Sequence, residues 1–138
     1  MMIEETTDLA ACHALRRTVF IEEQSVPEAD EMDDLDADAI HLLARDGDRP
    51  VATARLLIKG DIGKIGRVCV LADQRGTGLG AALMQAAIDA LIARGVREAH
   101  LGSQVHAMGF YEKLGFVAEG PVYDDAGIPH RDMVRVIA

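Results

Sequence analysis

A glycine-rich loop lies near the middle of the chain, Gln74-Arg75-Gly76-Thr77-Gly78-Leu79-Gly80, between an apolar strand-like run and an Ala/Leu-rich helical segment. Three alternating glycines let a backbone approach a ligand closely, because no Cβ stands in the way. The N–H groups of such a loop can converge on one point, and the following helix adds its positive N-terminal end. This arrangement binds phosphate oxygens. The loop therefore predicts a phosphorylated ligand.

The residues that flank the glycines indicate which class of phosphorylated ligand the loop binds. A nucleoside triphosphate loop places Lys and then Ser or Thr after its last glycine, whereas Gly80 is followed by two alanines. A dinucleotide fingerprint is formally met by Gly76, Gly78 and Ala81. That fingerprint expects an acid at the end of the next strand, where this chain has Gly102-Ser103. A dinucleotide-binding oxidoreductase thus remains only as a remote alternative.

Two motifs together resemble the GNAT superfamily of N-acetyltransferases. Arg75-x-x-Gly78-x-Gly80 resembles its acetyl-CoA pyrophosphate loop. Further along, Ala107-Met108-Gly109-Phe110-Tyr111-Glu112-Lys113-Leu114-Gly115-Phe116 resembles the signature of its late helix. Residues 15–24, 26–27, 39–43 and 127–130 also resemble the bacterial ElaA-like and YjcF-like branch of that superfamily. The resemblance spans most of the chain and leaves the acceptor substrate undefined.

Composition agrees with a small intracellular enzyme. With 138 residues, 49% of them hydrophobic, the chain is expected to form one domain over residues 1–138. No apolar run is long enough for a membrane span, and the N-terminus lacks a basic region of the secretory type. Two cysteines suit a reducing cytoplasm, and the net charge of −9 argues against a nucleic-acid partner. No metal site is predicted.

Hydrophobic periodicity and turn residues predict an alternating order of strands and helices. Strands are expected over residues 2–5, 40–45, 51–58, 64–71, 98–101, 116–118 and 133–137, and helices over 9–23, 79–94 and 105–114. Asp8 is a plausible N-cap of the first helix. Segment 24–38 is expected to be irregular, because of Pro27 and the acids around it. The resemblance implies the acyl-CoA N-acyltransferase fold, an α/β (layered α+β) domain with helices flanking a mixed, mostly antiparallel central sheet.

The resemblance also implies that the ligand is acetyl-CoA. In that superfamily two strands splay apart beside the phosphate loop, and the pantetheine arm of coenzyme A pairs with the backbone of the earlier strand. Arg75 can contact a phosphate or close the loop, and Gln104 stands where many relatives carry Asn. The expected cofactor-binding residues are Val68, Cys69, Val70, Arg75, Gly76, Thr77, Gly78, Leu79, Gly80, Gln104 and Tyr111.

Acyl transfer to an amine needs a base for the ammonium, a stabilised oxyanion and an acid for the thiolate. By resemblance Tyr111 is the general acid, since a phenol with a pKa of about 10 is protonated at neutral pH; otherwise it packs against the sheet. Cys69 reads as a small buried residue rather than a nucleophile. The candidates for the base are Glu22, Glu23, His41 and His130, or a water held by one of them.

Nine acids and no Lys or Arg lie between Glu22 and Asp38. Such a surface attracts a cationic amine, or it is a solvated loop that aids solubility. The sequence therefore predicts an N-acetyltransferase that transfers acetyl from acetyl-CoA to a primary amine by direct attack in a ternary complex. The acceptor is expected to be a small molecule or a peptide. A non-catalytic acyl-CoA-binding sensor remains as the alternative, and exposed sheet edges make a homodimer plausible.

Overall fold

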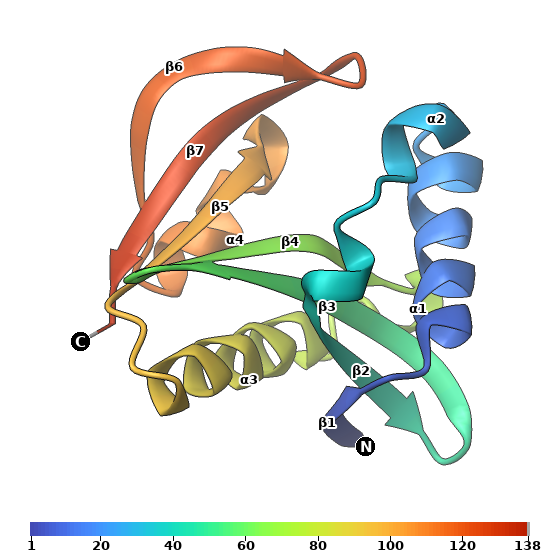
Figure 1. Cartoon of the computed structure of the whole chain (residues 1–138). Helices are drawn as coiled ribbons and strands as arrows, with labels where there is room; N and C mark the ends of the chain where they lie inside the picture. Colours follow the sequence, from blue (N-terminus) through green and yellow to red (C-terminus); the bar gives the residue numbers. More distant parts are fainter. Residues whose placement is uncertain (138) are drawn as a thin grey trace.

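One mixed sheet of seven strands runs through the computed structural model, which describes residues 1–137 (Figure 1). The spatial order of the strands is β1-β2-β3-β4-β5-β7-β6, and every neighbouring pair is antiparallel except β4 and β5. This confirms the mixed, mostly antiparallel sheet and departs from the all-parallel core of a dinucleotide fold. The strands are β1 (Met2–Thr6), β2 (Ile40–Asp46), β3 (Arg49–Lys59), β4 (Ile62–Val70), β5 (Glu98–Gln104), β6 (Val117–Asp125) and β7 (Ile128–Val136).

The two longest helical segments cover opposite faces of the sheet (Figure 1). Leu42 and Ala44 of β2 pack in the cluster that contains α3, whereas Leu43 packs in the cluster that contains α1, because successive side chains of a strand point to opposite faces. No helix among residues 1–137 is long and apolar enough to cross a membrane. The helices are α1 (Leu9–Arg16), α2 (Glu28–Glu31), α3 (Leu79–Ala93) and α4 (Met108–Lys113), with the shorter or irregular turns η1 (Arg17–Glu23), η2 (Asp36–Asp38), η3 (Ala72–Gln74) and η4 (Val105–Ala107).

The first helix begins where the sequence predicts and changes from an α-helix to a π-helix halfway along. Asp8 is its N-cap, and Oδ1 of Asp8 accepts a hydrogen bond from the N–H of Ala11 at 3.1 Å. From Arg17 the α-helix continues as a seven-residue π-helix, η1. A π-helix is rare and often lies at a functional site. Here its last turn brings Phe20 and Gln24 to the wall of a cleft.

The C-terminal hairpin is longer than the sequence indicates. Strands were expected over residues 116–118 and 133–137, but β6 and β7 extend over nine residues each. They are joined by Ala126 and Gly127, both at positive φ (53° and 80°), as in the two-residue turns that match strand twist. Pro121 lies within β6, which is an edge strand, where proline is tolerated.

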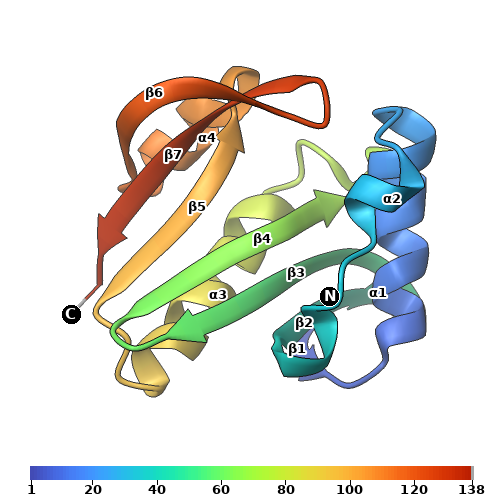
Figure 2. The ribbon, with the colours of Figure 1, turned by 45° about the horizontal axis from the view of Figure 1, so that its top comes forward.

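The acidic segment is also more ordered than expected. Within residues 24–38, which were expected to be irregular, the chain forms α2 and the 3₁₀ turn η2. Pro27 is the residue directly before α2, where its fixed φ favours the start of a helix. The segment lies over the same face of the sheet as α1 (Figure 2).

Candidate active site

β4 and β5 are neighbours that pair over only three residues. Ile62, Gly63 and Lys64 are in register with Glu98, Ala99 and His100, and beyond that point the strands diverge (Figure 2). The edge of β4 that faces β5 therefore has no strand partner beyond Lys64. Unpaired backbone groups in a protein interior are costly, so this edge is suited to a ligand that carries amides.

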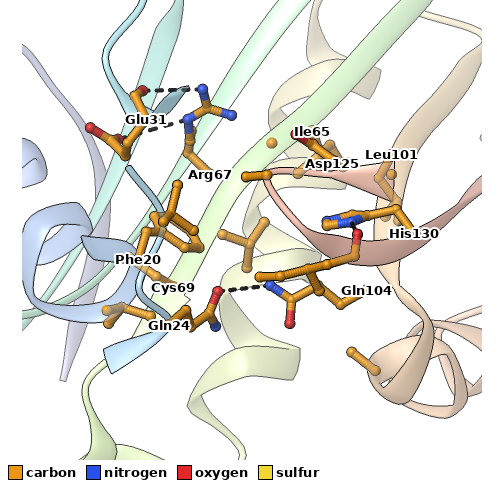
Figure 3. Close-up of a pocket in the computed structure, with 18 of the residues that line it drawn as sticks. Phe20, Gln24, Glu31, Ile65, Arg67, Cys69, Leu101, Gln104, Asp125 and His130 are labelled. Carbon is orange, nitrogen blue, oxygen red and sulfur yellow. Dashed lines mark hydrogen bonds and ion pairs between the residues drawn. The ribbon is translucent and has the colours of Figure 1, made fainter. Parts of the chain in front are cut away.

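A cleft of about 450 Å³ occupies the opening between the two strands. Its walls come from β4, β5 and the end of η1, with α2 and the tip of the β6–β7 hairpin on opposite sides of one end (Figure 3). Six of the residues that the sequence assigned to cofactor binding line this cleft: Val68, Cys69, Val70, Arg75, Gln104 and Tyr111.

The glycine loop follows directly after Arg75 and presents unpaired donors. Within residues 1–137, the N–H groups of residues 76–81 have no hydrogen-bond acceptor, and α3 has no side-chain cap. Gly76 and Gly78 have φ of 77° and 85°, a conformation that other residues adopt only with strain. Thr77 Oγ1 donates to the Gln74 carbonyl at 2.6 Å, and Leu79 anchors the loop in the core.

The third glycine has a packing role. A Cβ built on Gly80 would lie 3.3 Å from Cζ of Phe110. Gly80 therefore allows α4 to approach the N-terminus of α3, which places the two sequence motifs beside each other.

The Arg75 side chain turns back toward its own strand. Its Nε donates to the Val70 carbonyl at 3.0 Å, and its Nη2 donates to Glu23 Oε2 at 2.8 Å. Of the two roles that the sequence left open, this geometry corresponds to closing the loop. The same ion pair engages Glu23, one of the candidates for the base.

The structure does not bring the three base candidates Glu22, Glu23 and His41 to the cleft. None of them lines it. Glu22 is exposed, and His41 is buried on the α1 face with Nε2 at 2.9 Å from the Asp36 carbonyl. They were chosen by residue type and sequence neighbourhood, which do not report which way a side chain points. The fourth candidate, His130, does line the cleft.

Tyr111 lines the cleft. The hydroxyl makes no hydrogen bond within residues 1–137, while the ring packs edge-on against Phe110 and Phe116, with centroids 5.0 and 6.1 Å apart. Burial raises the pKa of Tyr111 to about 12. The phenol is therefore protonated at neutral pH.

The Cys69 thiol also borders the cleft and is unsuited to nucleophilic attack. It is 4% exposed and packs with Cys12, Leu15 and Val19. Burial raises the pKa of Cys69 to about 12, so the reactive thiolate is scarce at neutral pH. This agrees with its interpretation as a small core residue.

Two glutamines join the opposite walls of the cleft. Gln24 at the end of η1 accepts a hydrogen bond at Oε1 from Nε2 of Gln104 at the end of β5, over 2.8 Å (Figure 3). Oε1 of Gln104 in turn accepts from Nε2 of His106 at 2.6 Å. Sequence reasoning included Gln104 and missed Gln24, whose position depends on the π-helical turn.

Most of the acidic segment is neutralised by arginines from other elements. Five of the nine acids between Glu22 and Asp38 are ion-paired: Glu23 with Arg75, Glu28 with Arg17, Glu31 with Arg16 and Arg67, Asp33 with Arg55 and Arg67, and Asp36 with Arg16 and Arg55. The hypothesis of a broad acidic surface that attracts amines is therefore wrong for these five. Asp30, which borders the cleft, has no ion pair within residues 1–137.

The buried members of this group perturb one another. Burial alone would raise the pKa of Asp36, but hydrogen bonds from Arg16 and His13 outweigh it and hold the pKa well below its usual range. Burial would likewise raise the pKa of Asp33, and the hydrogen bond from Arg55 lowers it instead. Arg67 lies at a bulge of β4 with φ of 50°, and burial and the nearby Arg55 lower its pKa.

The chain resembles known proteins over nearly its whole length. The family model described as acetyltransferase (GNAT) domain matches residues 5–137. The uncharacterized N-acetyltransferase YjcF of Bacillus subtilis is 37% identical over 122 residues, which cover 88% of this chain and 87% of YjcF. Both sequence comparisons thus point to one group of proteins.

Two solved structures extend the comparison. An acyl-CoA N-acyltransferase from Pseudomonas aeruginosa superposes with a TM-score of 0.86 at 34% identity, covering 98% of this chain and 97% of that one. Escherichia coli ElaA superposes with a TM-score of 0.84 at 30% identity, covering 98% and 99%. The loop, the splayed strands and the late helix thus lie in a shared framework, and the chain belongs to the GNAT acetyltransferase family, with ElaA and YjcF among its relatives.

Proposed function

We propose that this protein is an acetyl-CoA-dependent N-acetyltransferase that acts on a primary amine by direct attack in a ternary complex. One observation carries the proposal. Tyr111 and the unpaired edge of β4 line a single cleft, and the loop of unpaired N–H groups follows directly after Arg75, which also lines it. Family membership supports the same reaction class.

The residues fit coenzyme A. The N–H groups of residues 76–81 and the N-terminus of α3 would hold the pyrophosphate, because both favour negative charge. The backbone of Val68 to Val70 would pair with the amides of the pantetheine arm. Gln104 would lie beside that arm, since it borders the cleft from the opposite strand.

Tyr111 would stabilise the departing sulfur. An ordinary thiol has a pKa of about 8.5, whereas the pKa of Tyr111 is about 12. The thiol is the stronger acid, so full proton transfer from the phenol to the thiolate is unfavourable. Its contribution in the transition state is then a hydrogen bond to the developing negative charge, which is the type of interaction that lowers a barrier selectively.

Calorimetric titration with acetyl-CoA tests the ligand, with NAD and ATP as controls. Selective binding is expected, and acetyl-CoA at a hundred times its Kd should stabilise the fold by about 2.7 kcal/mol in a thermal-shift assay. A folded protein that does not bind acetyl-CoA would contradict the proposal.

A screen of amines for thiol release tests the reaction. Transfer of acetyl to at least one primary amine is expected, while binding of acetyl-CoA without release in any mixture would indicate a sensor. Tyr111→Phe should lower kcat by about 10²-fold or more, the range of a lost oxyanion-type donor, and leave the Kd for acetyl-CoA nearly unchanged. Unchanged turnover would rule out the role of Tyr111.

A further inference from the structure

We propose that His130 is the general base that removes a proton from the ammonium group of the acceptor. This inference rests on the proposed N-acetyltransferase activity and identifies the residue that activates its acceptor. His130 lies in β7, in register with Gln104 of β5 on one side and Tyr123 of β6 on the other. Its ring points from β7 into the cleft (Figure 3).

The hydrogen bonding of the imidazole fixes which nitrogen is the base. Nδ1 of His130 lies 2.7 Å from the carbonyl oxygen of Ile128. A carbonyl can only accept, so Nδ1 carries the hydrogen, and the lone pair of the neutral ring is on Nε2. Nε2 makes no hydrogen bond within residues 1–137, which leaves it free for a proton from a ligand.

Neighbouring side chains hold the ring in place. Tyr123 stacks on it, with ring centroids 5.9 Å apart and an interplanar angle of 25°. The Tyr123 hydroxyl donates to Asp132 Oδ1 at 2.9 Å. That hydroxyl also lies 2.4 Å from where a Cβ on Gly102 would be, so the glycine in β5 makes room for the stack. The orientation of His130 is thus set from two neighbouring strands.

Two acids without an ion pair among the described residues line the same cleft as His130. Asp30 and Asp125 border the cleft and form no ion pair within residues 1–137, so they favour the approach of an ammonium group. His106 is exposed, and its Nε2 is bonded to Gln104. The other charged and titratable residues that line this space are Tyr123 and Asp125 on β6, Lys64, Arg67 and Cys69 on β4, Asp30 and Glu31 on α2, Arg75 before the glycine loop, His106 on η4 and Tyr111 on α4.

An imidazole also suits the proton transfer better than these carboxylates. A general base works best when its pKa lies near the working pH, and the pKa of an ordinary imidazole is closer to 7 than that of an ordinary carboxylate.

Nε2 of His130 takes one proton from R–NH₃⁺ and later releases it to water. The nitrogen lone pair forms the C–N bond, the C–S bond breaks with its electron pair on sulfur, and the second proton lost from nitrogen goes to that sulfur.

The test compares His130→Asn with the parent protein, using acetyl-CoA and an amine that the parent acetylates. The Asn amide can replace Nδ1 as donor to the Ile128 carbonyl but supplies no Nε2 lone pair. We expect kcat/KM for the amine to fall by about 10²–10⁴-fold and the acid limb of its pH profile to disappear. The Kd for acetyl-CoA and the melting temperature should be unchanged, as a catalytic role requires.

His130→Ala provides a second variant. Added imidazole is expected to increase its rate and to leave the rate of the parent unchanged. A folded His130→Asn protein with the parental rate and acid limb would overturn the role of His130 alone. If the parent binds acetyl-CoA but none of the amines tested causes thiol release, the proposed activity itself fails, and the role of His130 fails with it.

Discussion

The two faces of the sheet are stabilised by different physical means. On the α3 face the buried cluster is wholly apolar and includes Leu83, Ile88, Leu91 and Phe116. On the α1 face the apolar cluster is small, and Arg16, Glu31, Asp36 and Arg55 are buried beside it. Apolar burial contributes free energy without needing a particular partner. Buried charges stabilise only when every partner is present, so the α1 face depends on specific pairs.

The α1 face, which carries the buried ion pairs, lies beside the cleft. The ion pairs join α1, α2 and the strands β3 and β4. They therefore fix the position of α2, which carries Asp30 and Glu31 in the cleft wall. The comparison indicates that apolar packing on the α3 face stabilises the domain as a whole, whereas the ion pairs on the α1 face hold α2 in place beside the cleft.

Arg16→Ala should have the largest effect on stability. Arg16 is 1% exposed, and it donates to Glu31 Oε1 at 2.5 Å and to Asp36 Oδ1 at 2.9 Å. Its loss removes a hydrogen-bonded partner from each of two buried carboxylates, which within residues 1–137 keep only Arg67 (Glu31) or Arg55 and His13 (Asp36). We therefore expect the free energy of unfolding to fall by about 3–5 kcal/mol in urea titrations at neutral pH. The neighbouring Arg17→Ala breaks only an exposed pair and should cost about 0–1 kcal/mol. Equal losses would show that burial does not decide what an ion pair of the α1 face contributes.

Leu91→Ala tests the apolar face. Leu91 is fully buried, and truncation should cost about 2–5 kcal/mol. A Cβ on Gly63 of β4 would lie 2.5 Å from Leu91 Cδ2, so Gly63→Ala alone should cost about 1–3 kcal/mol by overpacking. The double variant should be more stable than the sum of the two losses implies, as measured by a double-mutant cycle. Additive losses would show that the contact does not limit packing.

Acid should weaken the α1 face selectively. The folded-state pKa values of Asp36 and Asp33 lie below their ordinary values. Their contribution is therefore present above the ordinary carboxyl pKa of about 3.9 and is lost as pH falls through the folded values. Asp36→Asn should cost about 1.5–3 kcal/mol at neutral pH and flatten the fall in stability between neutral pH and about pH 3. Leu91→Ala should keep the parental slope, and a steeper or flatter slope there would contradict the assignment to one face.

A matched pair of helix ends should give the smallest effect. Ser25 follows η1 with φ of 58°, and Gly95 follows α3 with φ of 75°. Glycine adopts this conformation without strain. Ser25→Gly should therefore stabilise by about 0.4–1 kcal/mol and Gly95→Ala should destabilise by a similar amount. Changes of the same sign in thermal unfolding would show that local backbone strain does not decide either site.

Features that are contiguous in the sequence could be predicted, and those that depend on distant partners could not. The glycine loop and the Tyr111 motif each lie within one short stretch, so their local structure follows from local residues. The pairing of the acidic segment was missed because its arginines come from α1, β3 and β4. Only the folded chain brings them together.

Two local features, the π-helix η1 and the β6–β7 turn, were missed because their sequence signals are weak. η1 spans only seven residues, fewer than two helical turns, so hydrophobic spacing alone does not separate an α-helix from a π-helix there, and the change at Arg17 was not visible. The β6–β7 turn places Ala126, rather than Asn, Asp or Gly, at its first left-handed position, which hid the hairpin and the setting of His130.

The bridge between Gln24 and Gln104 has a consequence for ligand entry. A neutral hydrogen bond contributes a net 0.5–1.5 kcal/mol, roughly, and 1.4 kcal/mol corresponds to about a tenfold change in affinity. A molecule that separates the two side chains therefore loses at most about tenfold in affinity, and less if its own amides bond both glutamines. The bridge therefore imposes only a small free-energy cost on a ligand that enters between the two side chains.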